Sequence, residues 1–356
     1  MTVVPLKVAG PKGYPLVSII ILNYNAVSFL KNCFDSVLNS TYPNIEIVFV
    51  DNASTDGSVD FIKSNYGHLQ KLKFVLNNQN LGFNEGNNVG FAQSNGEFCV
   101  FMNPDAKIND PSTIEKIVQV LLVRKTVGII APVLLNYDSD IVQSAGVYQS
   151  FRPFEYGKGE HYKAFIEKNP VLFPIAVTPG AFVLIRRSMA EKIGLFDKVF
   201  FMQGDIDDLS FRAWKKGYTV AILPTVTVMH YEGGSVKHDF VTNNQRVLRI
   251  YYHGIRADFA VILKNFDPQT VLKFWSLRLL IYFIETSLIS LKYKKPYSLM
   301  AYFMGIWWNV RQFKSMYSKR KRLRQDHLCS DRDIMPYILG NCGASNYIMR
   351  FRQFRS

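Results

Sequence analysis

LVSIIILN, residues 16–23, is a short apolar run rich in β-branched side chains, which is typical of a strand buried on both faces of a sheet. IEIVFVDN, residues 45–52, is a second run of the same kind. The whole pattern predicts strands over 16–23, 45–52, 72–78 and 97–105, with helices over 29–40 and 56–66 and a loop entering a helix over 82–95. Strands that alternate with helices at this spacing indicate an α/β fold with a mostly parallel central sheet and helices on both faces.

Polar side chains stand at the carboxyl ends of these strands. They are Asn23, Asp51, Asn52, Asn103 and Asp105. In open parallel sheets ligands bind beyond the carboxyl ends of the strands. The sequence therefore predicts a ligand site at this edge of the sheet.

The C-terminal third has a different character. Strand signals fade beyond about 240, and two very apolar helices are expected over 271–292 and 299–318. Arg278 and Glu285 interrupt the first of them, and its longest uncharged piece is far shorter than the about 20 residues that span a bilayer. Residues 251–356 hold 18 of the 42 Lys and Arg residues and 6 of the 28 Asp and Glu residues, so +12 of the net charge of +14 lies here.

Apolar helices followed by the basic run 311–325 are typical of an element that lies on an anionic membrane surface. A helical subdomain packed on the body, or a surface that pairs two chains as a homodimer, are the alternatives. A nucleic-acid partner is not expected, because the body is nearly neutral and no RNA-binding or helix-turn-helix motif is present. The lack of a secretory signal and of any CxxC pair favours a cytoplasmic protein with reduced thiols.

Two motifs at the predicted strand ends could carry chemistry. In VDNASTDGS (50–58) a carboxylate at a strand end precedes a hydrogen-bonding turn, although Ser54 or Thr55 could simply cap a helix. In FMNPDA (101–106) a carboxylate held by the preceding proline could ligate a divalent cation that bridges two phosphates. A plain type I turn explains this second motif equally well.

FFMQGDIDDLSFRAWKKGY (200–218) holds three carboxylates within four residues at the start of a predicted helix. One of them could act as general base for a substrate hydroxyl. The alternative is an acidic helix N-terminus in which Asp208 pairs with Arg212 at i,i+4. In HYEGGS (230–235), His230 follows an apolar strand, where it could contact a metal or phosphate or be purely structural.

Taken in order, the segments resemble the family 2 glycosyltransferases with the GT-A fold, specifically their rhamnosyltransferase-like branch. The matching pieces are VSIIILNYN (17–25), VDNASTDGS (50–58), NQNLGFNEGNNVGF (78–91), FMNPD (101–105), TPGAFVLIRR (178–187), GLFDKVFFMQGDIDDLSFRAWKKGY (194–218) and HYEGGS (230–235). The resemblance implies a tail over 1–14, a GT-A domain over 15–240 and a helical, basic region over 241–356. Within the domain, 15–106 would form the nucleotide-sugar half and 107–240 the acceptor half.

The resemblance also assigns roles to residues. Donor-binding residues would be Asn23, Asp51, Asn52, Asn80, Gly82, Asn87, Asn88 and Asn103, with Asn23 and Asp51 on the base. Asp105 would bind Mg²⁺ or Mn²⁺, with His230 near the diphosphate or as a further ligand. Thr178, Pro179, Gly180 and Ala181 would shape the acceptor side.

One position departs from the family pattern. Family members usually carry Glu-Asp-x-Asp at the acidic cluster, and Ile206 here occupies the position of the catalytic base. The resemblance then implies that Asp205 takes over, as the residue nearest the loop, or that Asp207 does, or that activity is weak or lost.

The implied reaction is inverting sugar transfer from a nucleotide diphosphate donor, dTDP-L-rhamnose first and a UDP-hexose next. The acceptor would be a growing cell-surface glycan, including one linked to a polyprenyl diphosphate, at the inner face of the cell membrane. A catalytically inactive scaffold that binds nucleotide sugar or glycan is the alternative that Ile206 keeps open. A dinucleotide-dependent oxidoreductase is not expected, because no GxGxxG follows the first strand.

Overall fold

The computed structural model describes residues 13–149, 153–231, 243–292, 294, 296–325 and 327–339. Most of the expected tail over 1–14 lies outside these residues. So do residues 232–235 of the HYEGGS motif, the expected boundary at 240 and the C-terminal segment from 340 onward.

The first half of the chain forms four parallel strands in the spatial order β3-β2-β1-β4. They are β1 (Val17–Asn23), β2 (Ile45–Asp51), β3 (Leu72–Leu76) and β4 (Phe98–Met102). Helices α1 (Val27–Leu38), α2 (Ser58–Tyr66) and α3 (Gly82–Gln93) connect them. The predicted alternation of strands and helices is confirmed. The strands form because buried β-branched runs can satisfy their backbone groups by pairing inside a sheet.

Residues 106–230 extend the same sheet with mixed pairing. Strand β11 (Phe182–Arg186) runs antiparallel to β4 and joins it to β6 (Val127–Asn136), which pairs in parallel with β12 (Thr219–His230). The shorter strands are β5 (Ala106–Ile108), β7 (Val142–Ser144) and β10 (Phe173–Pro174), with β8 (Val147–Gln149) and β9 (Pro153–Glu155) as a separate pair. The sheet is therefore purely parallel only over β1–β4.

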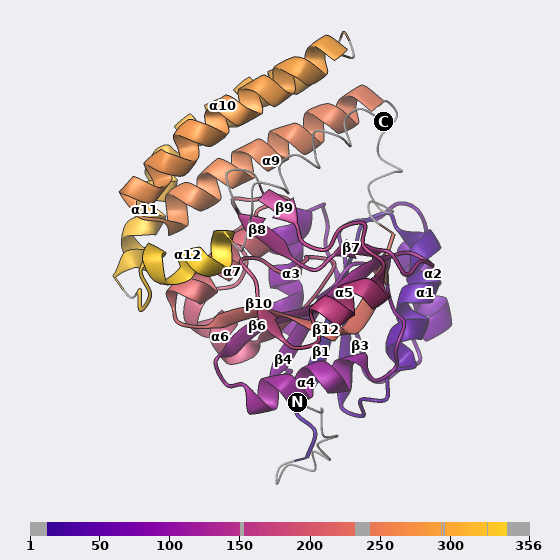
Figure 1. The fold of residues 1–356 in the computed structure, drawn as a ribbon. Coiled ribbons are helices and arrows are strands. Elements are labelled where there is room, and N and C mark those ends of the chain that lie inside the picture. The colour runs from indigo at the N-terminus through magenta and orange to yellow at the C-terminus, as the bar shows by residue number, and fades with distance from the viewer. Residues whose placement is uncertain are drawn as a thin grey trace.

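Helices cover both faces of the sheet, as Figure 1 shows. Ile19 and Ile21 of β1 belong to the core on one face, with residues of α1, α2 and α4 (Thr113–Val123), whereas Ile20 belongs to the core on the other. That second core includes residues of α6 (Arg187–Ile193) and α7 (Asp205–Lys215), together with Phe165 of α5 (Tyr162–Lys168). The alternation of side chains along a strand thus supplies two separate apolar cores.

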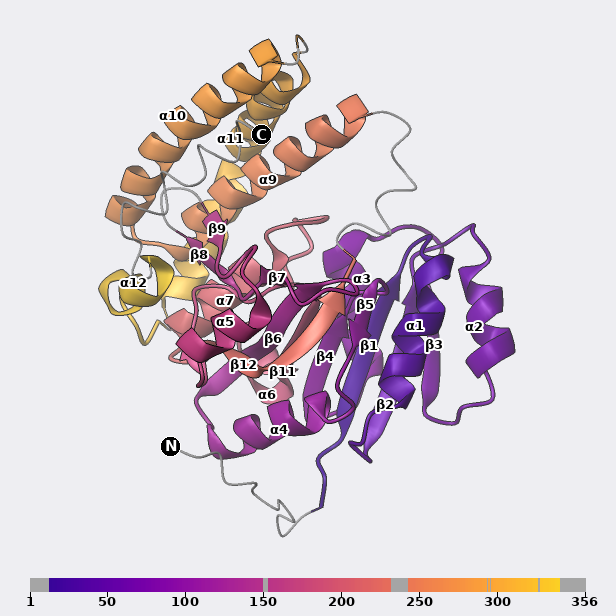
Figure 2. The same ribbon diagram turned by 45° about the vertical axis from the view of Figure 1, so that its right-hand side comes forward.

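The C-terminal helices lie beside the sheet domain, next to α7 (Figure 2). They are α9 (Asn243–Asn265), α10 (Pro268–Lys292), α11 (Tyr297–Arg324) and α12 (Asp331–Leu339). The two predicted apolar helices are confirmed as α10 and α11, whereas α9 was not predicted. Buried Lys215 at the end of α7 is ion-paired with Asp331 of α12, so charge contacts join these helices to the sheet domain.

Helix α10 is long and apolar enough to cross a membrane by length and composition, contrary to the expectation drawn from its two interrupting charges. Both charges are turned toward protein. Arg278 is buried and ion-paired with Asp258, and Glu285 accepts a hydrogen bond from the Tyr251 hydroxyl at 3.1 Å. Counting charges along the sequence therefore underestimated how apolar the outer face of α10 is.

Candidate active site

The ends of β1 and β2 are tied together by side chains. Asn23 Nδ2 donates to Asp51 Oδ1 at 2.8 Å, and Asp51 Oδ2 accepts from the Ser54 amide at 2.8 Å. Both Asn23 and Asp51 are buried, and neither lines the adjacent cavity. These two residues were expected to contact the nucleotide base. In the structure they link the ends of β1 and β2 beside the cavity.

The loop before α3 reaches the same edge of the sheet. Asn52 Nδ2 donates to Asn80 Oδ1 at 3.3 Å and to the Gly82 carbonyl at 3.1 Å. Gly82 has φ of +78°, and a Cβ there would lie 2.4 Å from the carbonyl oxygen of Phe201. Only glycine fits this close approach. Asn52, Asn80 and Gly82 all line the cavity, as expected for donor-binding residues.

Asn87 and Asn88 do not line the cavity, in contrast to the expectation. Asn87 Nδ2 donates to the Phe83 carbonyl one helical turn earlier, at 3.0 Å. Asn88 Nδ2 donates to the Phe196 carbonyl at 2.9 Å. Their positions on α3 turn them toward the protein, where they hold neighbouring backbone.

Asp105 and His230 meet at the other end of the cavity. His230 Nε2 lies 3.3 Å from Asp105 Oδ1 and 3.5 Å from Asn103 Nδ2. Gln143 Nε2 donates to the His230 carbonyl at 3.2 Å, so Gln143 Oε1, 2.7 Å from His230 Nδ1, receives the proton of that nitrogen. In the neutral ring Nε2 is then an acceptor that faces a carboxylate, an arrangement suited to a cation.

This pair fits a divalent ion only in part. Among the described residues, no group of three or more His, Cys, Asp or Glu side chains is placed to hold a metal. A carboxylate and an imidazole are ligands that Mn²⁺ accepts, but an octahedral ion needs further oxygens. Those would have to come from water and from a ligand such as a diphosphate.

The acidic cluster lies at the start of α7, behind a turn in which Gln203 and Gly204 both have positive φ. Asp205 Oδ1 accepts from the Ile206 amide at 2.6 Å, and Ile206 itself is buried. Asp207 Oδ1 accepts from Gln149 Nε2 at 2.5 Å. Asp205 is therefore engaged with its own backbone, whereas Asp207 is held by a side chain from β8.

Burial raises the pKa of Asp205. It also raises the pKa of Asp207 to about 7, with the negative charges of Asp205 and Asp258 adding to the rise. A carboxyl group with a pKa near neutrality is well matched to general-base work. Of the two, Asp207 is the one that a side chain of another element, Gln149 of β8, also holds.

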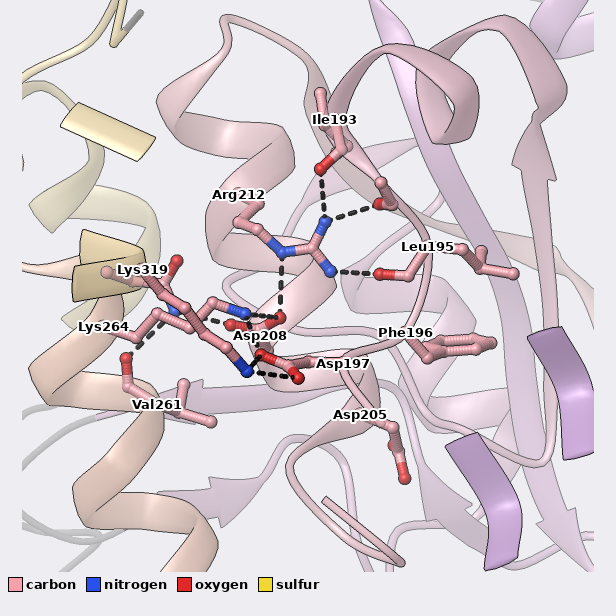
Figure 3. A network of polar contacts seen from close by, with 12 residues as sticks. Ile193, Leu195, Phe196, Asp197, Asp205, Asp208, Arg212, Val261, Lys264 and Lys319 are labelled. Carbon is pink, nitrogen blue, oxygen red and sulfur yellow. Dashed lines mark hydrogen bonds and ion pairs between the residues drawn. The ribbon is translucent and has the colours of Figure 1, made fainter. Parts of the chain in front are cut away.

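Asp208 has a structural role, and its predicted pairing with Arg212 is confirmed at 2.8 Å. Lys264 of α9 bridges Asp208 at 2.9 Å and Asp197 at 2.8 Å, and Lys319 of α11 also pairs with Asp197 (Figure 3). The nearby cations Lys264 and Arg212 hold the pKa of the buried Asp208 well below its usual range. We call Asp197, Asp208, Arg212, Lys264 and Lys319 the charge clamp; it joins α7 to two C-terminal helices.

The loop before α3, the start of α7 and His230 surround one cavity of about 560 Å³, which we call the first cavity. The residues singled out from sequence that line it are Asn52, Asn80, Gly82, Asn103, Thr178, Pro179, Gly180, Ala181, Asp205, Asp207 and His230. Asp105 lies just behind His230. Buried Thr178 leaves its Oγ1 without a hydrogen-bond partner among the described residues. A bound ligand could supply that partner.

Several lining residues were missed from sequence. Gln143, Glu155, Gln203 and Arg249 all line the first cavity. Gln143 and Glu155 lie on short strands with no sequence signal of their own, and Arg249 belongs to the C-terminal region that was interpreted only as a surface element. Gln203 lies two residues before Asp205, so its closeness to the acidic cluster was a sequence signal that could have identified it.

The sequence of this chain is similar to those of known glycosyltransferases. Residues 18–194 match the family described as Glycosyl transferase family 2. An uncharacterized glycosyltransferase of Haemophilus influenzae is 36% identical over 107 residues, which is 30% of this chain and 33% of that protein. The N-acetylglucosaminyl-diphospho-decaprenol L-rhamnosyltransferase of Mycobacterium tuberculosis is 22% identical over 62% of this chain and 78% of its own length. The chain thus matches only a third of the length of the Haemophilus relative.

Solved structures share the fold. The mannosyltransferase PcManGT of Pyrobaculum calidifontis, solved with GDP-Man and Mn²⁺, matches 89% of this chain and 87% of its own with a TM-score of 0.55 and 16% identity. The fold is therefore of the GT-A type with a helical C-terminal region, as expected. The family match and the related glycosyltransferases show that residues 18–194 belong to glycosyl transferase family 2.

Proposed function

We propose that this chain is an inverting glycosyltransferase that moves a sugar from a nucleotide diphosphate donor to an acceptor hydroxyl. The observation that carries the proposal is the first cavity. It holds a carboxylate with a pKa near neutrality, Asp207, and a carboxylate–imidazole pair, Asp105 and His230, borders it. A base for the acceptor and a site for the leaving diphosphate are the two parts that the reaction needs.

The step is a single displacement. The acceptor oxygen forms a bond to the anomeric carbon while the bond from that carbon to the diphosphate oxygen breaks. Asp207 takes the proton of the acceptor hydroxyl, and the electron pair of the broken bond leaves with the diphosphate. Asp207 is favoured over Asp205, because the pKa of Asp207 is raised to about 7 and Gln149 of β8 orients its carboxylate.

Asp105 and His230 would hold Mg²⁺ or Mn²⁺ together with the diphosphate, and Asn103 lies within reach of the same place. When bound, the ion supplies positive charge that stabilises the leaving group. Gln143 keeps the imidazole in the orientation that presents Nε2, in the way that outer-shell partners orient metal-binding histidines.

The donor we propose is dTDP-L-rhamnose, with a UDP-hexose as the second candidate. The Mycobacterium relative named as an L-rhamnosyltransferase supports rhamnose, together with the ordered motifs of the sequence. The same relative is named for an acceptor on a decaprenyl diphosphate, which supports a lipid-linked glycan here.

Thermal unfolding with added nucleotide tests the donor site. A ligand at 100 times its dissociation constant adds about 2.7 kcal/mol to stability. We expect dTDP with Mn²⁺ to raise the melting temperature of the wild type and to do so much less in Asp105→Asn. Asp140→Asn is the matched control, because Asp140 forms an exposed pair with His161.

Each outcome assigns the function differently. Stabilisation by UDP alone would move the donor to a UDP-hexose. Nucleotide binding without release of nucleoside diphosphate from any donor and acceptor pair would favour the inactive scaffold that Ile206 leaves open. No stabilisation by dTDP, UDP or GDP would refute the donor site.

We further propose that the chain lies on the cytoplasmic face of the cell membrane through α10 and α11. Large apolar side chains are exposed on both helices; they include Leu280, Phe283, Ile284, Leu288, Leu291, Met300, Phe303, Met304, Trp307 and Val310. Trp307 is 59% exposed, and the last turn of α11 carries Lys321 and Arg322. Apolar faces flanked by basic residues favour an anionic lipid surface.

Vesicle flotation tests this surface. We expect the chain to float with vesicles that contain phosphatidylglycerol, and the bound fraction to fall severalfold in the double variant Phe303→Ser, Trp307→Ser. Leu76→Ser is the control, because Leu76 is 47% exposed on β3, in the sheet domain. If the wild type is a dimer by light scattering and the double variant is a monomer, the face pairs two chains instead.

A further inference from the structure

A second cavity of about 640 Å³ lies between the sheet domain and the C-terminal helices. It borders the first cavity, because Val147, Glu155, Gln203, Gly204 and Asp207 line both. The carboxylate proposed as the base is thus accessible from two sides. Asn52, Asn80 and His230 line the first cavity and not the second, and so do residues 178–181, which the resemblance had assigned to the acceptor side.

One wall of the second cavity is apolar. Its members lie on α7, α9 and α10 and include Phe211, Ala257, Val261, Ile262, Phe266 and Phe274. All of them are buried in the apolar core that covers this face of the sheet. A cavity with such a wall suits a ligand that carries an apolar group.

Polar side chains beside this wall also line the second cavity, and hydrogen bonds connect them. Gln149 donates to Asp207 at 2.5 Å and accepts from Arg278 Nη2 of α10 at 3.1 Å. Arg278 is ion-paired with Asp258 of α9, which also accepts from the Tyr282 hydroxyl at 3.0 Å. This chain of contacts runs from Asp207 through Gln149 to Arg278 of α10 and Asp258 of α9.

Gln203 lies in the shared wall, and its amide oxygen is buried without a hydrogen-bond partner among the described residues. A buried acceptor without a donor is unfavourable, because it has lost its hydrogen bonds to water. A hydroxyl group of a bound sugar would supply the missing donor. The shared wall therefore offers two acceptors for sugar hydroxyls, Gln203 and Asp207.

We propose that the second cavity binds the acceptor, and that this acceptor is an amphiphilic glycoside. Its sugar lies against Gln203 and Asp207, with the reacting hydroxyl on Asp207. Its apolar aglycone lies along Val261, Ile262 and Phe274. The inference deepens the proposed function and rests on it, since it assigns the acceptor class for the same base. The C-terminal helices then select the acceptor in addition to offering a surface to the membrane.

Photolabelling of the wild-type full-length chain tests the site without any variant. The probe is an n-octyl β-D-glucoside with a diazirine at the end of its chain, used below its critical micelle concentration. We expect labels on the cavity faces of α9 and α10, at Val261, Ile262 or Phe274. We expect n-octyl β-D-glucoside to compete at least roughly tenfold better than methyl β-D-glucoside, because only the former has the apolar group.

A matched pair of substitutions adds a second test. Val261→Trp fills the cavity and should reduce cavity labelling at least roughly tenfold. Val123→Trp makes the same change on α4 at a side chain that is 59% exposed, and should leave cavity labelling unchanged. Thermal unfolding with dTDP and Mn²⁺ verifies that both variants are folded and keep the donor site.

The proposal is overturned if labels occur only on the exposed faces of α10 and α11, or nowhere. Equal competition by the methyl and octyl glucosides overturns it too, because the apolar wall would then contribute nothing. These failures differ from failure of the proposed function, which would appear as a wild type that no nucleotide stabilises.

Discussion

Replacing Lys264 by methionine tests whether the charge clamp fixes the C-terminal helices to the sheet domain. The Lys264 side chain is 6% exposed and contacts Asp197 at 2.8 Å and Asp208 at 2.9 Å. Removing one partner of a buried ion pair costs about 3–5 kcal/mol, because the remaining charge is left in a medium that solvates it poorly. Asp208 keeps Arg212 and Asp197 keeps Lys319, so we expect the lower end of that range.

Urea denaturation at pH 7 measures this loss, with Lys116→Met as the control. Lys116 pairs with Asp110 at 2.7 Å, but its side chain is 46% exposed, and such surface pairs contribute about 0–1 kcal/mol. The clamp also predicts the pH dependence. Since the pKa of Asp208 is depressed in the folded state, the stabilisation is present above its unfolded pKa of about 3.9 and is lost as the pH falls below it.

We therefore expect the difference in the free energy of unfolding between the wild type and Lys264→Met to narrow below about pH 4. A variant that loses no more stability at pH 7 than Lys116→Met would refute the reasoning. A difference that stays constant down to pH 2 would show that the loss comes from packing of the lysine stem and not from charge.

Three further predictions concern the site. Asp207→Asn should lower kcat by about 10²–10⁴-fold with nucleotide-induced stabilisation retained, and Asp205→Asn should lower it less, both measured as release of nucleoside diphosphate. Since Asp207 must be deprotonated to act as base and its pKa is about 7, kcat/KM should rise with pH through neutrality. Arg278→Met removes a cation that lowers the pKa of Asp207, so this variant should show the rise at higher pH. Gly82→Ala should destabilise the chain in urea by about 1–3 kcal/mol more than Gly159→Ala, because both glycines have positive φ but only Gly82 has a close neighbour.

Local sequence was enough to predict the donor half of the sheet. The buried runs of β1 and β2 and the polar residues at their ends follow from periodicity, because a parallel strand buried on both faces must be apolar along its whole length. The same rule predicted that Asn52 and Asn103 would reach one edge, and both line the first cavity. It could not separate them from Asn23 and Asp51, which do not line the cavity. Asn87 and Asn88 were assigned by the family resemblance, and the direction of a side chain on α3 depends on how that helix packs.

Contacts between distant segments were beyond the reach of the sequence. Gln149, Arg278 and Asp258 come from β8, α10 and α9, and nothing in their local sequence links them to Asp207. The charges within α10 predicted an interrupted apolar helix, whereas folding turns Arg278 toward protein and leaves an apolar outer face.

The sequence by itself therefore determined the α/β architecture, the edge of the sheet that carries the candidate site and the carboxylates available there, since these depend on side-chain type and on short-range periodicity. The tertiary structure alone decided which carboxylate has a pKa near 7, which is buried in the charge clamp, and that the C-terminal helices form a second cavity beside Asp207. Those outcomes depend on burial and on partners far apart along the chain, and both exist only once the chain has folded.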